Sequence, residues 1–94
     1  MFKISWTSTF VKTSKKFFKK HPQLKSDFKD LLTQLEEDPF QQRLKLHQLK
    51  GLHKEKYSVS LTYSYRIVLY LKIVNKQIIL LDIGSHDTFI SKQK

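Results

Sequence analysis

His86 stands in a setting where a histidine could act as an acid or a base. It follows Gly84 and Ser85, where a predicted strand ends in a turn, and loops that leave a rigid sheet often carry functional side chains. An imidazole can accept or donate a proton near neutral pH. Asp87, the next residue, is placed to orient the ring or to accept its second N–H. A lone histidine is more often a surface or capping residue, but this setting favours a catalytic His86 assisted by Asp87.

Arg66 is the second unusual residue, because it lies inside an apolar run. It stands between Tyr65 and Ile67, and it is one of only two arginines among the 18 Lys and Arg residues. A charge in such a strand is costly unless it is paired or faces water. One explanation is a salt bridge to Asp82 or Asp87 across an exposed sheet face. The other is a guanidinium that binds phosphate, for which its planar set of donors is well suited.

A cluster of basic and imidazole side chains surrounds Gly51: His47, Lys50, His53, Lys54 and Lys56. Such groups near a loop can bind phosphates or supply a general base. The alternative is a solvated loop without a function. The 4 histidines are not at metal-ligand spacing and the chain has no cysteine, so we expect neither a metal nor a cofactor.

Tyrosines could offer flat surfaces on which RNA bases stack. Most of the 4 tyrosines should instead pack in the core or across strands. Tyr63 and Tyr65 flank Ser64 in a predicted turn before the Arg66 strand, so these two are the better candidates for exposure and for RNA binding.

The elements that position these residues can be read from the periodicity of the apolar side chains. Alternation over residues 2–6 predicts a strand. Ser8 or Thr9 can cap a helix that runs to about Lys20 and ends before Pro22. A second helix follows, and the dipeptide Asp38-Pro39 stops it. Its apolar face is formed by Leu24, Phe28, Leu31, Leu32 and Leu35.

The second half of the sequence changes to the period of strands. Runs over 57–62, 65–74 and 77–83 predict an antiparallel meander, with a hairpin turn at Asn75-Lys76 and a break at Gly84. If the alternation holds, Arg66 points away from the face that carries its apolar neighbours. We therefore predict one α+β domain over residues 1–94, in the order β-α-α-β-β-β, with both helices packed on one face of the sheet.

Composition narrows the class of partner. The 94 residues suit one domain, and 18 Lys and Arg against 8 Asp and Glu give a net charge of +10. A field of that sign attracts nucleic acid, an anionic membrane surface or an acidic protein. We expect no signal peptide, and no run of the sequence is long enough to span a membrane. We expect a cytoplasmic protein that engages RNA.

Four blocks resemble a known family: Asp38-Pro39, Leu46 to Gly51, Tyr63 to Tyr70 and Leu80 to Asp87. Together they are similar to the RelE/ParE toxin superfamily, and within it to the YafQ-like messenger-RNA interferases. The resemblance implies a ribosome-associated, metal-independent endoribonuclease that is held silent by an acidic antitoxin encoded beside it. By position, it makes His86 a catalytic residue of the final loop, Arg66 the phosphate-binding arginine, and His47 the histidine before the Leu-x-Gly sequence.

The sequence also departs from the family pattern. Lysines that RelE-like members carry before the arginine are Ser58 and Ser60 here, and the histidine and aspartate of YafQ-like members correspond to Leu61 and Tyr65. Many relatives have a tyrosine at the end of the His-Asp block, where this chain has Thr88, Phe89 and Ile90. Three alternatives stay open: a ParE-like toxin that inhibits DNA gyrase, a catalytically weakened homologue that binds its antitoxin, and a plain RNA-binding domain.

Overall fold

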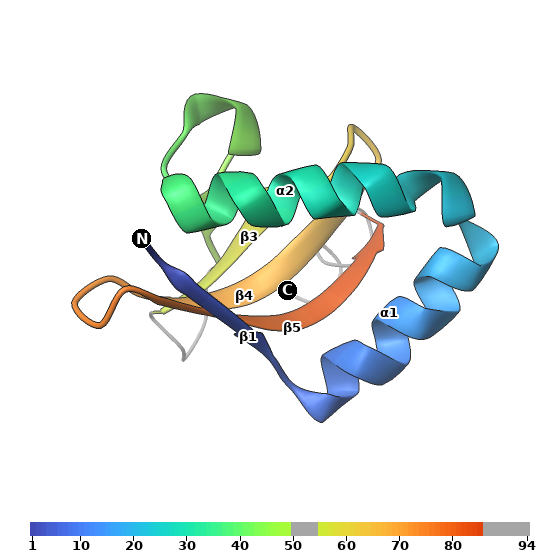
Figure 1. The fold of residues 1–94 in the computed structure, drawn as a ribbon, viewed down its shortest axis with the longest axis horizontal. Coiled ribbons are helices and arrows are strands. Elements are labelled where there is room, and N and C mark those ends of the chain that lie inside the picture. The colour runs from blue at the N-terminus through green and yellow to red at the C-terminus, as the bar shows by residue number, and fades with distance from the viewer. Residues whose placement is uncertain (50–54, 86–94) are drawn as a thin grey trace.

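One mixed sheet, covered on one side by two helices, forms the molecule (Figure 1). The computed structural model describes residues 1–49 and 55–85, and within them five strands lie in the order β1-β5-β4-β3-β2. The elements are β1 (Lys3–Trp6), α1 (Ser8–Lys20), the 3-10 helix η1 (Pro22–Leu24), α2 (Lys25–Glu37), the 3-10 helix η2 (Gln42–Leu44), β2 (His47–Gln48), β3 (Lys56–Ser60), β4 (Tyr65–Lys72) and β5 (Gln77–Ser85). β1 pairs parallel with β5, and every other pair is antiparallel. The predicted α+β order is confirmed, with the two-residue strand β2 added to it.

Helix α1 begins one residue earlier than the predicted caps imply. Thr7, rather than Ser8 or Thr9, is the N-cap: its backbone is extended and its Oγ1 accepts a hydrogen bond of 3.1 Å from the backbone N–H of Phe10. The helix ends at Lys20 as predicted, because the residue before Pro22 is excluded from helical backbone angles.

Helix α2 follows after the single turn η1, in which Pro22 occupies the first position. Leu31 and Leu35 are buried against the sheet, and Phe28 packs on Phe18 of α1 with 5.1 Å between ring centroids. Asp38 ends the helix as its C-cap. Neither helix, nor any other in the described part of the chain, has the length and apolar character needed to cross a membrane.

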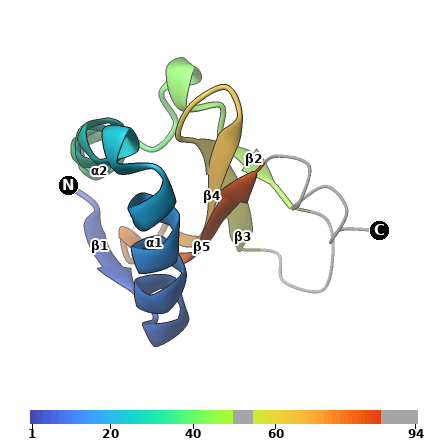
Figure 2. The same cartoon turned by 90° about the vertical axis from the view of Figure 1, so that its right-hand side faces the viewer.

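The main core lies between the helices and the sheet, and Figure 2 shows both helices on the same side. β4 and β5 supply most of its fully buried side chains: Ile67, Leu69, Leu71, Ile78 and Leu80. The predicted alternation in β4 is confirmed, since Arg66 and Val68 are not part of this cluster. The other side of the sheet, which we call the open face, carries a smaller cluster of Leu49 and Val68 with Leu81 packed against it.

Two strand ends differ from the prediction. β4 stops at Lys72, and Val74, expected in the strand, is 96% exposed in the following turn. Gly84 was expected to break β5, but the strand continues through it to Ser85 because β4 is long enough to pair with it: Gly84 lies opposite Arg66, and Ser85 lies opposite Tyr65.

Replacing Thr7 with alanine is expected to lower the free energy of unfolding by about 1 kcal/mol, because the Phe10 amide loses its acceptor. Ser8→Ala is the matched control, and its effect should stay within about 0.5 kcal/mol. Urea unfolding followed by circular dichroism measures both variants. If both variants lose the same amount of unfolding free energy, the side chain of Thr7 does not stabilise the helix as its N-cap.

Candidate nucleic-acid interface

The strand register determines which polar side chains share the open face. Residues directly opposite each other in paired strands point to the same side of a sheet. Two neighbouring rows of such residues cross the open face: Ser60, Arg66 and Gly84 in one, and His47, Ser58, Val68 and Asp82 in the other. The register therefore brings two predicted site residues, Arg66 and His47, to the same face of the sheet.

Within residues 1–49 and 55–85, three hydrogen bonds hold the guanidinium of Arg66. Its Nε donates to the hydroxyl of Ser58 at 2.9 Å, and its Nη2 donates to the carbonyl oxygens of Lys45 at 2.7 Å and of Ser58 at 3.2 Å. The side chain is only 7% exposed. All three acceptors are neutral, and the Asp82 carboxylate is not one of them. Asp87, the other carboxylate considered as a salt-bridge partner, lies outside the described residues. These contacts orient the positive charge without cancelling it.

Burial lowers the pKa of Arg66 from its ordinary value, because removing water penalises the charged form. Arginine nevertheless remains protonated in proteins, since its ordinary pKa is so high. The open face therefore carries a fixed and largely desolvated positive charge. The three bonds use Nε and Nη2, so Nη1 is the nitrogen that they do not engage.

The same bonds tie three segments of the chain together. Lys45, directly after η2, has a left-handed backbone with φ 50° and ψ 47°, which is unfavourable for a residue with a side chain. Its carbonyl accepts the shortest of the Arg66 bonds. Arg66 thus connects β4 to β3 and to the segment that leads into β2.

A β-bulge in β5 shapes the neighbouring part of the open face. Val68 pairs with Asp82 but Leu69 pairs with Leu80, so Leu81 is an extra residue. As a result, Leu81 packs on the open face while Ile83 still reaches the main core. Asp82 accepts a 2.9 Å hydrogen bond from the backbone N–H of Ile83.

The other predicted RNA-binding residues in the described part of the chain have different surroundings. Lys56 pairs with Tyr70 on the open face and is half-buried. Tyr63 is 97% exposed in the turn between β3 and β4, as expected. Tyr65 begins β4, as the predicted strand over 65–74 implied, but it is half-buried and not exposed. It points to the helix side, where its ring contacts Phe17 at 5.0 Å between centroids.

Five predicted site residues lie outside the described residues: Lys50, His53, Lys54, His86 and Asp87. Their contacts are therefore not part of the geometry above. Among residues 1–49 and 55–85, no group of three or more His, Cys, Asp and Glu side chains is arranged to hold a metal ion.

Sequence reasoning missed two partners of Arg66. Ser58 appeared only as a departure from a family pattern, although the predicted alternation could have placed it on the face of Arg66. The contact with the Lys45 carbonyl could not be predicted, because nothing in the sequence indicates that Lys45 has a left-handed backbone. His21, which contacts Tyr65 through its ring at 4.9 Å, was also passed over.

Arg66→Met should lower the free energy of unfolding by about 1–3 kcal/mol, because it leaves the Ser58 and Lys45 acceptors without a charged donor. Arg43→Met is the matched control: this exposed arginine makes one 3.3 Å bond, to Gln41, and its loss should cost less than about 0.5 kcal/mol. Thermal and urea unfolding compare the two. An Arg66→Met protein as stable as the parent would contradict a structural role for these bonds.

No protein-family model matches the sequence, and no curated protein matches it. Solved structures do. The YafQ chain of the E. coli DinJ–YafQ complex is 20% identical, with 94% of this chain and 97% of that chain covered and a TM-score of 0.76. A metal-bound toxin from Helicobacter pylori is 27% identical, with 94% and 98% covered and a TM-score of 0.72. A YoeB/ParE toxin from Agrobacterium tumefaciens is 20% identical, with 89% and 98% covered and a TM-score of 0.71.

These similarities extend over nearly the whole of each chain, so they concern the complete arrangement of helices and strands and not a shared fragment. They include both the YafQ and the YoeB/ParE groups, as the resemblance of the four sequence blocks implied. The chain therefore has the fold of the RelE/ParE toxin superfamily, with YafQ among its structural neighbours.

Proposed function

We propose that the protein is the toxin of a type II toxin–antitoxin system, and that it is a metal-independent endoribonuclease that cleaves messenger RNA, on the ribosome, to stop translation. The observation that carries this proposal is the environment of Arg66. Its guanidinium is fixed on the open face by neutral acceptors, so its charge is available to a phosphate group. A pre-oriented charge stabilises a transition state better than a mobile one.

The proposed chemistry needs few groups. A base removes the proton of the RNA 2′-hydroxyl, the 2′-oxygen attacks phosphorus, and an acid protonates the 5′-oxygen that leaves. Arg66 stabilises the charge that develops on the phosphate, through Nη1. His86, oriented by Asp87, and His47 are the proposed acid and base, and a metal is not required.

Several further residues are proposed to hold the RNA strand. Positive side chains near the open face would contact phosphates, and exposed Tyr63 would stack on a base. Lys56 lies in β3 on that face. The remaining proposed RNA contacts are Lys50, His53, Lys54 and Tyr65.

The proposed partner in the silent state is an acidic antitoxin encoded next to this protein. A net charge of +10 on 94 residues favours a partner of opposite charge. Two of the similar structures are complexes of YafQ with DinJ, described in one case as a toxin–antitoxin complex.

A second candidate is a homologue that binds its antitoxin but cleaves RNA weakly. It is favoured by one observation: Ser58, which faces Arg66 from the neighbouring strand, is 1% exposed and serves as an acceptor for the guanidinium. A serine in that position orients Arg66 but adds no charge of its own at the open face.

Expression without a partner is expected to arrest growth and to fragment messenger RNA, and His86→Ala should lower cleavage by about 100-fold or more, as removal of an acid-base group does. Arg66→Ala should have a similar effect, whereas Arg43→Ala, which removes the other arginine, should not. Cleavage of a defined messenger RNA in a reconstituted translation reaction measures all three, with thermal unfolding as the check on folding.

Different results point to different functions. If His86→Ala and Arg66→Ala fold normally and stay as toxic as the parent, the proposed site is wrong. Intact transcripts with failing DNA supercoiling would identify a ParE-like gyrase inhibitor. Intact transcripts with normal supercoiling and retained antitoxin binding would identify the weakened homologue.

A further inference from the structure

A groove on the helix side of the sheet is distinct from the face that carries Arg66, and Tyr65, one of the proposed RNA contacts, lines it. It lies between the C-terminal half of α1 and the adjoining ends of β4 and β5, and its volume is about 450 Å³. Tyr65 lines it from the start of β4, and Ile83, Gly84 and Ser85 line it from the end of β5. The groove therefore opens at the same end of β4 as Arg66, on the opposite side of the sheet.

The floor of the groove is aromatic. Phe17, His21 and Tyr65, the aromatic floor, contact one another with 4.8 to 5.0 Å between ring centroids. The Tyr65 hydroxyl and the His21 Nε2 are 3.4 Å apart. All three side chains are half-buried, so each ring is fixed by packing and still contributes surface to the groove. The rings are inclined to one another, with interplanar angles of 41° to 81°, so a planar ligand would stack on the face of a single ring that packing holds in place.

The rim of the groove is cationic. Lys16, Lys19 and Lys20, the lysine rim, are all exposed. Lys16 and Lys20 lie one helical turn apart, as do Phe17 and His21, so the cations follow the floor along α1. Helix α1 contains no acidic residue that would neutralise them.

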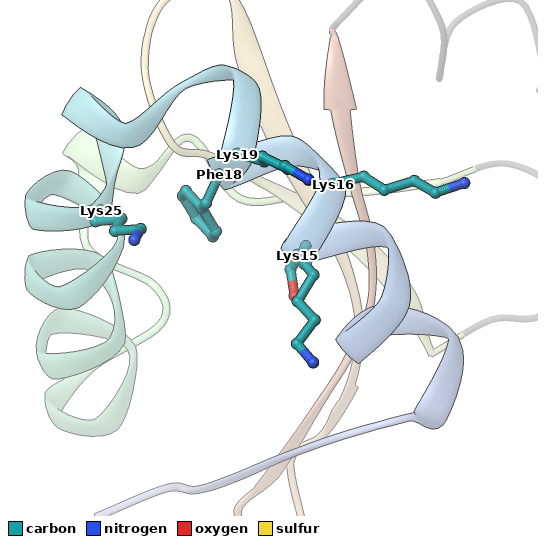
Figure 3. A pocket seen from close by; sticks show the side chains of 6 residues that line it. Lys15, Lys16, Phe18, Lys19 and Lys25 are labelled. Carbon is teal, nitrogen blue, oxygen red and sulfur yellow. The ribbon is translucent and has the colours of Figure 1, made fainter.

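Positive charge continues around α1 beyond the groove. A second hollow, of about 580 Å³, lies between α1 and the start of α2, and Figure 3 shows the lysines that line it together with Phe18. Lys16 and Lys19 line both hollows, and Lys15 and Lys25 extend the positive surface. A chain of phosphates along α1 would meet lysines on both sides of the helix.

We propose that the groove binds one nucleotide of single-stranded RNA, with the base stacked on the aromatic floor and the flanking phosphates on the lysine rim. Acidic side chains of a peptide would use the rim but not the floor, whereas a single nucleotide supplies a phosphate for the rim and a planar base for the floor. This inference rests on the proposed function for one point only: the strand that occupies the groove is the strand that Arg66 and His86 cleave. The groove would then bind a nucleotide of that strand on the side of the sheet opposite the cleaved bond.

The test uses the full chain and a fluorescent hexanucleotide of 2′-O-methyl RNA, which has no free 2′-hydroxyl and so cannot be cleaved. A second hexanucleotide has the same phosphates but abasic positions. Tyr65→Leu should weaken binding of the base-bearing hexanucleotide by about tenfold, because one stacked base is lost. Its affinity for the abasic hexanucleotide should stay close to the affinity of the parent protein. Tyr65→Phe, which keeps the ring, should retain most of the affinity.

The lysine rim is tested by the double variant Lys16→Ala/Lys20→Ala. It should weaken binding of both strands and reduce the slope of log affinity against log salt by about 1.4, because two phosphate contacts are lost. Lys12→Ala/Lys29→Ala is the matched control, since it removes the same charge from exposed positions that line neither hollow. The control should change the slope by less than half as much.

Three outcomes overturn the proposal. They are unchanged hexanucleotide affinity in Tyr65→Leu, equal weakening for the base-bearing and abasic strands, and equal effects of the two lysine pairs. If Tyr65→Leu unfolds, His21→Leu replaces it, because it alters the same floor from α1. Failure of the proposed function can be told apart from failure of this inference. A chain that binds the hexanucleotide as predicted but never cleaves RNA would contradict the nuclease activity and would leave the nucleotide-binding groove supported.

Discussion

The positive charge of Arg66 imposes a constraint on much of the surrounding structure. A guanidinium that is 7% exposed must find acceptors, and here they come from β3 and from the segment after η2. Ser58 has to be small and hydroxylated, and Lys45 has to present its carbonyl from a left-handed backbone. The same constraint gives the open face its oriented charge, so one set of hydrogen bonds serves both the stability of the sheet and the chemistry proposed for it.

The periodicity of the sequence was sufficient to predict the order of the helices and of the main strands, but not the parallel pairing of β1 with β5. Alternation in β4 assigned Ile67, Leu69 and Leu71 to the core and Arg66 to the other face, because a strand has only two faces and the apolar side chains must share one. The dipeptides His21-Pro22 and Asp38-Pro39 marked the helix ends, because proline restricts the residue before it. These features depend on local sterics and on burial, which are visible in the sequence.

Features that depend on contacts between distant segments could not be predicted in the same way. β5 continues through Gly84 because β4 supplies a partner there, and a glycine in a paired strand looks the same in the sequence as a glycine that ends one. The bulge at Leu81 has no sequence marker either. Tyr65 was expected to be exposed, and so its contacts with Phe17 and His21, which form the aromatic floor of the groove, were not foreseen. Of the predicted site, Arg66 and His47 are on one face of the sheet, and the role of each remains a proposal.

The position of β1 has a consequence for how the chain folds as it is made. β1 pairs with β5, the last strand among the described residues, with Lys3 opposite Gln77. Pairing of segments so far apart in sequence is slow to form, because the intervening chain must be ordered or looped out. During synthesis β1 has no strand to join until β5 leaves the ribosome. If the protein does stop translation, its own sheet cannot be completed until residues 77–85 have themselves been translated.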